Sequence, residues 1–144
     1  MQIDLYTDGG ARGNPGPAAV GAVVKKDSQV VENYAETIGR ATNNQAEYRA
    51  VIFGLQKIKS LYGKQKVKQV EVNVFVDSEL LANQLNHKYK IKNEEIQSLF
   101  IEVWNLMLDF KKVSFNHIRR EENKEADKLL NQALDGAGDN KSLF

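Results

Sequence analysis

Every second residue is apolar at the start of the chain, beginning with Ile3 and Leu5. This period of two is typical of a β-strand with one buried face. The segment 9–17 follows, and it is so rich in glycine and proline that we expect a loop there. Two further stretches contain small and β-branched residues separated by a short polar turn. The pattern predicts an antiparallel meander of three strands, at residues 2–8, 18–24 and 29–38.

The apolar period then changes to that of a helix. Thr42 or Asn43 can cap its first turn, because the side-chain oxygen of either residue accepts a free backbone N–H. The helix is expected to end near Tyr62, before Gly63. At 100° per residue, Glu47 falls in the middle of the apolar stripe of this helix. A carboxylate that faces the core is costly unless it is paired or binds a cation, so Glu47 is the strongest anomaly in the sequence.

The second half of the chain alternates strands with helices. A strongly β-branched strand ends directly before Asp77, and an amphipathic helix with a 3.6-residue repeat lies further along. A basic loop at 87–93 and a charged loop at 119–122 connect these elements. The predicted strands are 70–76 and 112–118, and the predicted helices are 78–86, 94–110 and 123–134.

The order of these elements, β-β-β-α-β-α-α-β-α, indicates an α/β fold. A meander followed by alternating strands and helices favours a mixed five-stranded sheet, with antiparallel and parallel strands and flanking helices. A chain of 144 residues suits one domain with one core. We expect this domain to cover residues 1–135. The segment 136–144 has little to pack against, and we expect it to be a flexible tail.

Composition excludes several classes of protein. No apolar run approaches the roughly 20 residues of a membrane span, and no secretory signal pattern begins the chain. Without cysteine there is no disulfide or thiolate chemistry, and two histidines are too few for a zinc site. No serine–histidine–acid order is visible. A net charge of +1 gives no support to a purely electrostatic nucleic-acid binder. We expect a cytoplasmic monomer without an obligate protein partner.

Four acidic residues stand where elements begin or end. Asp8 and Asp77 follow strands, and parallel strands would bring these two carboxylates together. Glu47 begins a helix, and Asp127 lies at the edge of the last helical stripe. Clustered carboxylates repel, so without a cation one would hold a proton. Mg²⁺ prefers oxygen ligands, and two such ions can clamp a phosphodiester. Taken singly, each acid could instead be an ordinary cap or turn residue.

Four motifs resemble those of type 1 ribonuclease H, and with the element order they extend over about residues 2–135. The motifs are YTDGGARGNPGP at 6–17, TNNQAEY at 42–48, VDSEL at 76–80 and HIRREENKEAD at 117–127. The resemblance implies a ribonuclease H-like fold and an endonuclease that cuts the RNA strand of RNA/DNA hybrids. It also implies two Mg²⁺ ions, with Mn²⁺ as a substitute, and products with 3′-hydroxyl and 5′-phosphate ends.

The resemblance also assigns roles to residues. It implies that the metal ligands are Asp8, Glu47, Asp77 and Asp127. It implies substrate contacts at Gly9, Gly10, Ala11, Gly13, Asn14, Asn43, Asn44, Glu79 and Asn123. A glycine-rich loop lets backbone groups approach the hybrid. Distinguishing RNA from DNA requires reading 2′-hydroxyl groups in a shallow minor groove, so we expect little sequence preference.

Three features depart from the family pattern. Many relatives carry a histidine in the loop before the last helix, but the loop 119–122 has none. His117 precedes that loop, and its role is either catalytic or structural. The basic segment 87–93 is a short substitute for the long basic protrusion of some relatives, so hybrid affinity is expected to be lower and more salt-sensitive. This chain has Glu79 at a position where relatives often have glutamine.

Two other interpretations compete with a hybrid-specific nuclease. One is a non-catalytic module that binds hybrids or other double strands. Four repelling carboxylates argue against it, since a binder gains nothing from them. The other is a different nuclease of the same fold, such as a junction resolvase or a domain of a reverse transcriptase. The motifs at 6–17 and 42–48 favour ribonuclease H over this alternative.

Overall fold

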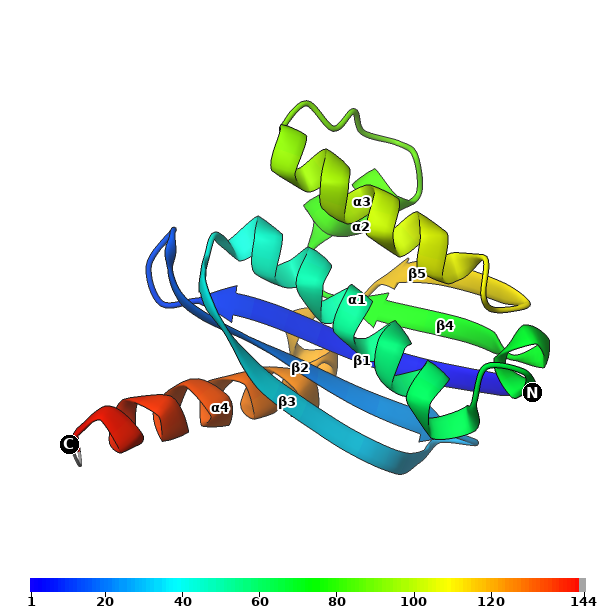
Figure 1. Ribbon diagram of the computed structural model, residues 1–144, viewed down its shortest axis with the longest axis horizontal. Helices are drawn as coiled ribbons and strands as arrows, with labels where there is room; N and C mark the ends of the chain where they lie inside the picture. Colours follow the sequence, from blue (N-terminus) through cyan, green and yellow to red (C-terminus); the bar gives the residue numbers. More distant parts are fainter. Residues whose placement is uncertain (143–144) are drawn as a thin grey trace.

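Five strands form one mixed sheet with the order β3-β2-β1-β4-β5. The computed structural model describes the backbone of residues 1–142 and the side chains of residues 1–137. The first three strands pair antiparallel, whereas β1 pairs with β4, and β4 with β5, in parallel. The strands are β1 (Gln2–Ala11), β2 (Gly16–Lys26), β3 (Gln29–Ala41), β4 (Glu71–Val76) and β5 (Lys112–His117). The predicted meander and mixed sheet are confirmed (Figure 1).

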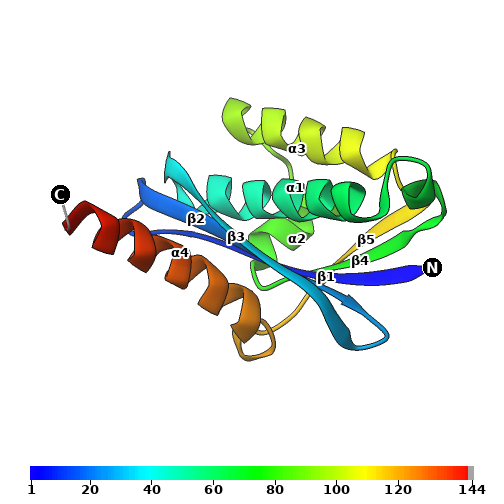
Figure 2. The same cartoon turned by 60° about the horizontal axis from the view of Figure 1, so that its bottom comes forward.

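Helices cover both faces of this sheet. Figure 2 shows α1 and α3 on one side and α4 on the other. The helices are α1 (Asn43–Tyr62), α2 (Glu79–Leu85), α3 (Glu94–Met107) and α4 (Lys124–Ser142), with short 3₁₀ helices at Lys66–Gln69 and Arg120–Glu122. The main core lies between α1 and the sheet, and a smaller cluster joins α4 to β2 through Ala19, Leu130 and Leu134. Within residues 1–142 no helix has the length and apolar character that a membrane crossing requires.

The first strand is longer than the sequence pattern predicts. Gly9, Gly10 and Ala11 were expected in a loop, but they pair with the first residues of β2. Their backbone groups find partners there, and glycine without a side chain is compatible with an extended chain. The connection between β1 and β2 is therefore confined to residues 12–15, and Asp8 lies inside a strand instead of at its end.

Other boundaries differ by a few residues. The helix predicted to reach residue 110 ends at Met107, and the last strand ends at His117. The last helix was expected to stop near residue 134, but α4 continues to Ser142, since no proline interrupts its hydrogen bonding. Residues 143–144 lie outside the described part of the chain, and the flexibility of the segment 136–144 stays a prediction.

Two glycines allow the helices to lie unusually close to the sheet. A Cβ atom at Gly9 would overlap the backbone carbonyl of Ala46 in α1, and one at Gly21 would overlap the carbonyl of Ala126 in α4. Real Cβ atoms do not tolerate such overlap, so only glycine fits at these positions. Asp8 adjoins Gly9 in β1, and Asp127 adjoins Ala126 in α4. These close contacts therefore bring the acidic residues of β1, α1 and α4 together.

Candidate active site

Four carboxylates line one cavity of about 370 Å³ beside the second half of β1 and the carboxyl end of β4. They come from four different elements of the fold: Asp8 from β1, Glu47 from α1, Asp77 from the end of β4 and Asp127 from α4. The parallel register pairs Tyr6 with Phe75. The same offset carried two residues further places Asp8 beside Asp77. The structure thus brings together all four acids that the sequence singled out.

The start of α1 is fixed by a reciprocal cap. Thr42 accepts a hydrogen bond from the backbone N–H of Gln45 at 3.2 Å, and its own N–H donates to Oε1 of Gln45 at 2.9 Å. Of the two predicted caps, Thr42 and Asn43, the structure uses Thr42. One half-turn later, Glu47 is half-buried and its side chain is hydrogen-bonded to Ser78. Burial, the largest cause, and the neighbouring Asp77 raise the pKa of Glu47, although Arg120 and the Ser78 hydrogen bond oppose this.

Asp8 is the most strongly perturbed of the four acids. Its pKa is raised from 3.8 to about 8, first by burial and then by repulsion from Asp77 and Asp127. A hydrogen bond to Asp127 and repulsion from Glu47 raise it further. The raised pKa favours the protonated form of the Asp8 carboxyl, which can then donate to Asp127. This is the outcome expected of clustered carboxylates without a cation.

Asn123 connects three elements behind the cavity. Its Nδ2 donates to the backbone oxygen of Thr7 at 2.9 Å and to Oδ2 of Asp77 at 3.0 Å. The side chain is 1% exposed, so it holds the ends of β1 and β4 against α4. Its Nδ2 is committed to these two acceptors and its Oδ1 has no hydrogen-bond partner among the described residues, so the predicted substrate contact stays a prediction.

The cavity suits a divalent cation by its chemistry. All four acids offer hard oxygen ligands, and among the described residues no ion pair involves any of them. In residues 1–137 no group of three His, Cys, Asp or Glu side chains has the geometry of a formed metal site. The four carboxylates are the oxygen donors that Mg²⁺ prefers, so the residues that line the cavity fit such an ion.

The residues predicted to meet substrate fall into two groups. Gly9, Gly10, Ala11 and Asn43 line the cavity itself. Asn43 accepts a hydrogen bond from the Ala11 N–H at 2.9 Å, and its own backbone N–H donates to Asn14 at 3.0 Å, which joins the β1–β2 loop to α1. Outside the cavity lining are Gly13, Asn14, Asn44 and Glu79; all but the half-buried Asn44 are exposed.

His117 is not brought into the cavity. It is exposed at the end of β5, an edge strand, where it pairs with Val76. Sequence reasoning instead missed Arg120, which lines the cavity, and Asn131, which donates to Asp127. The spacing of four residues between Asp127 and Asn131 on one helix was a usable signal. No local pattern indicated Arg120.

Comparison with known proteins gives a consistent result. The reverse transcriptase-like family model matches residues 6–133. Ribonuclease H of Lachnoclostridium phytofermentans is 30% identical over 158 aligned positions, covering 94% of each chain. Ribonuclease HI of Halobacterium salinarum is 38% identical, over 94% of this chain and 66% of the relative. A bifunctional protein of Mycobacterium tuberculosis is 37% identical, but the chain spans only 36% of its length.

Solved structures agree with the sequence relatives. The crystal structure of LC11-RNase H1 in complex with an RNA/DNA hybrid superimposes with a TM-score of 0.89 at 39% identity, covering 94% of this chain and 98% of that one. RNase H1 from Halobacterium salinarum superimposes with a TM-score of 0.87 at 36% identity, covering 94% and 99%.

Proposed function

The chain belongs to the ribonuclease H family, and we propose that it is an endonuclease that hydrolyses the RNA strand of RNA/DNA hybrids. The observation that carries the proposal is the shared cavity of Asp8, Glu47, Asp77 and Asp127, with the Asp8 pKa raised to about 8. Such a concentration of negative charge is destabilising by itself and becomes useful when a cation binds. LC11-RNase H1, a relative at 39% identity, was crystallised with an RNA/DNA hybrid.

Enzymes of this family are metal-dependent. We propose that the four carboxylates hold two Mg²⁺ ions, for which Mn²⁺ can substitute. When bound, these ions would supply an activated water and would stabilise the leaving oxygen of the phosphodiester. The products would carry 3′-hydroxyl and 5′-phosphate ends.

The chain's own residues orient the candidate metal ligands and determine the pKa of Asp8. A bound cation would favour the ionised form of Asp8, because it would offset the burial and the repulsion from Asp77 and Asp127 that raise the pKa of Asp8. Asn123 keeps Asp77 in place through the hydrogen bond between its amide and Oδ2. Arg120 adds positive charge at the cavity wall, where a substrate phosphate would lie.

Recognition of the hybrid follows from the surface beside the carboxylates. Gly9 and Gly10 line the cavity without side chains that would block a backbone approach. Asn14 presents an exposed side chain, and Asn43 lies at the cavity wall. Backbone and amide groups can bond to 2′-hydroxyls in a shallow minor groove without reading bases. We therefore propose selectivity for hybrids with little sequence preference.

One set of reactions tests this function. A labelled RNA/DNA hybrid, RNA duplex, DNA duplex and single-stranded RNA are each incubated with Mg²⁺ and with a chelator. We expect cutting of the hybrid RNA strand only with Mg²⁺, and none by Asp77→Asn. Binding of the hybrid without cutting would instead support a non-catalytic module, and equal cutting of the RNA duplex would remove the hybrid selectivity.

We further propose that the protein acts as a monomer in the cytoplasm. The core closes within one chain, and the absence of cysteine suits a reducing compartment. Light scattering on the purified protein tests the monomer, and fractionation of the source cells tests the compartment.

A further inference from the structure

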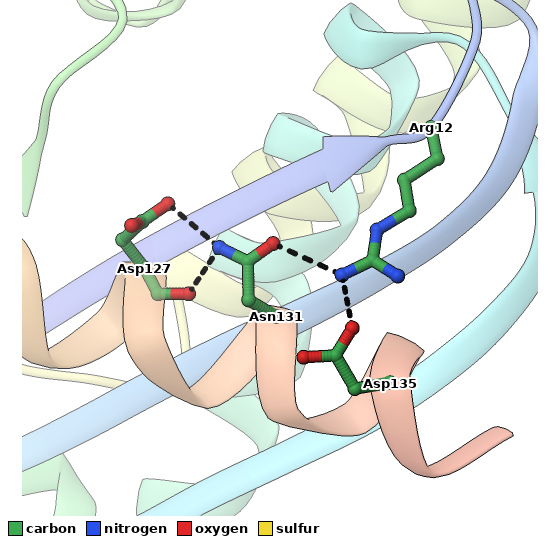
Figure 3. A network of polar contacts seen from close by, with 4 residues as sticks. All are labelled: Arg12, Asp127, Asn131 and Asp135. Carbon is green, nitrogen blue, oxygen red and sulfur yellow. Dashed lines mark hydrogen bonds and ion pairs between the residues drawn. The ribbon is translucent and has the colours of Figure 1, made fainter. Parts of the chain in front are cut away.

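A chain of polar contacts runs from the β1–β2 loop to one of the candidate metal ligands. Figure 3 shows its four members, Arg12, Asn131, Asp127 and Asp135. The last three lie on α4 at spacings of four residues, so their side chains follow one face of the helix. Arg12 approaches this face from the loop after β1. None of these contacts is needed to close the core, because Arg12, Asp127 and Asp135 are exposed.

Asn131 is the member that touches Asp127. Its Nδ2 donates to Oδ1 of the Asp127 carboxylate at 3.2 Å and to the Asp127 backbone oxygen at 3.0 Å. The bond to the backbone oxygen holds the Asn131 amide in place, and the bond to Oδ1 restricts the rotation of the exposed Asp127 carboxylate. A neutral amide does this without adding positive charge. A lysine or arginine in the same place would compete with a metal ion for Asp127.

Arg12 determines which way the Asn131 amide points. The guanidinium has only donors, so it favours the orientation in which Oδ1 of Asn131 faces Arg12 and Nδ2 faces Asp127. The contact from Arg12 Nη2 to that oxygen is long, at 3.5 Å. However, the same nitrogen is held by Asp135 Oδ1 at 2.6 Å, so the guanidinium stays beside the amide.

We propose that Asn131 is a positioning residue that orients Asp127 for metal binding, and that Arg12 acts through it. The proposal rests on the function proposed above, since it gives Asp127 the role of a ligand. The contacts of Arg12 and Asn131 would also couple the β1–β2 loop, which follows the cavity-lining residues 9–11, to the Asp127 carboxylate on α4. Residues that orient a metal ligand typically change affinity or activity by about 10-fold or more when they are replaced.

The decisive measurement is Mn²⁺ binding to the protein without hybrid, by titration calorimetry. Asn131→Leu approximately keeps the volume of the side chain and removes both the Nδ2 donor and the Oδ1 acceptor of the amide. We expect it to weaken Mn²⁺ binding about 10-fold and to lower kcat without changing KM for the hybrid. The matched control is Gln132→Leu, the same kind of change at the exposed neighbouring position on α4, and it should bind Mn²⁺ like the parent protein.

The role of Arg12 is tested by a double-mutant cycle. Arg12→Ala should weaken Mn²⁺ binding about threefold when Asn131 is present, a coupling typical of side chains in contact, and should have no further effect on Asn131→Leu. In metal-free protein, NMR should show that Arg12→Ala speeds exchange of the Asn131 side-chain amide protons, which a purely catalytic effect would not do.

Failure of this inference is separable from failure of the proposed function. If the parent protein cuts hybrids and binds Mn²⁺, and Asn131→Leu matches it in affinity, the positioning role is wrong and the nuclease assignment stands. If Arg12→Ala weakens Mn²⁺ binding equally in the parent protein and in Asn131→Leu, Arg12 does not act through Asn131. If the parent protein neither binds Mn²⁺ nor cuts the hybrid, both proposals fail together.

Discussion

Replacing Asp8 by asparagine should stabilise the metal-free protein at neutral pH. The asparagine has the shape of a protonated aspartic acid, and its amide can donate to Asp127 as the Asp8 carboxyl does. It cannot ionise, so it removes the cost of placing another negative charge beside Asp77, Asp127 and Glu47. The gain in stability from this substitution should therefore grow with pH, as the Asp8 carboxyl ionises in the unfolded chain.

The sign and size of this effect follow from the raised pKa of Asp8. Its value is 3.8 in the reference state and about 8 in the folded protein, so between these values the folded state binds more protons than the unfolded chain. Stability of the parent protein thus falls as pH rises from about 4 to about 8, and it levels off above that range. At pH 7 the cost reaches about 4 kcal/mol as an upper bound. Water that enters the half-buried site reduces this cost. We therefore expect Asp8→Asn to raise the free energy of unfolding by about 1–4 kcal/mol, and each kcal/mol to raise the melting temperature by about 3 °C.

Thermal unfolding in chelator at several pH values measures this directly. The melting temperatures of the parent and Asp8→Asn should coincide near pH 4 and separate progressively up to pH 8. With saturating Mg²⁺ the order should reverse, because ligand binding to the folded state stabilises only the protein that keeps its ligand. The control is Asp27→Asn in the exposed β2–β3 turn, which should follow the parent. Parallel pH profiles for the parent and Asp8→Asn would refute the reasoning.

Three further substitutions test the architecture around the site. Asp77→Asn should lower Mg²⁺-dependent cutting by about 1,000-fold or more with an unchanged circular dichroism spectrum; substantial residual activity would contradict its assignment as a ligand. Gly21→Ala should destabilise the fold by about 2–3 kcal/mol in urea, because the new methyl group overlaps the Ala126 carbonyl. Its control, Gly136→Ala on the open side of α4, should not destabilise. Asn123→Leu should cost about 1–3 kcal/mol in the same assay by leaving buried partners unpaired, and an unchanged unfolding midpoint would refute its bridging role.

Much of the site was visible in the sequence because it depends on local patterns. The period-two run before Asp8, the β-branched strand before Asp77 and the capped helix around Glu47 are all set by residues close in the chain. Glu47 was informative for a simple reason: at 100° per residue a charged group fell within an apolar stripe. The structure explains this anomaly by placing the carboxylate at the cavity.

Other features depend on contacts between distant segments. The extension of β1 through Gly9–Ala11 requires the backbone of β2 as a partner. The burial of Asn123 requires Thr7, which is 116 residues away in sequence. His117 is exposed because it is the last residue of β5, beyond Val113 and Phe115, which are buried on the same strand.

The sequence by itself determined the elements, their order and the identity of the four acids, because periodicity, caps and turn residues act over a few neighbouring positions. Only the tertiary structure decided how close the acids lie, that the pKa of Asp8 is the most strongly raised, and that Arg12 contacts Asn131, which in turn donates to Asp127. Those properties depend on strand register and on the close approach of α1 and α4 at Gly9 and Gly21. Desolvation and charge repulsion act through space, and so they depend on distances that no local segment encodes.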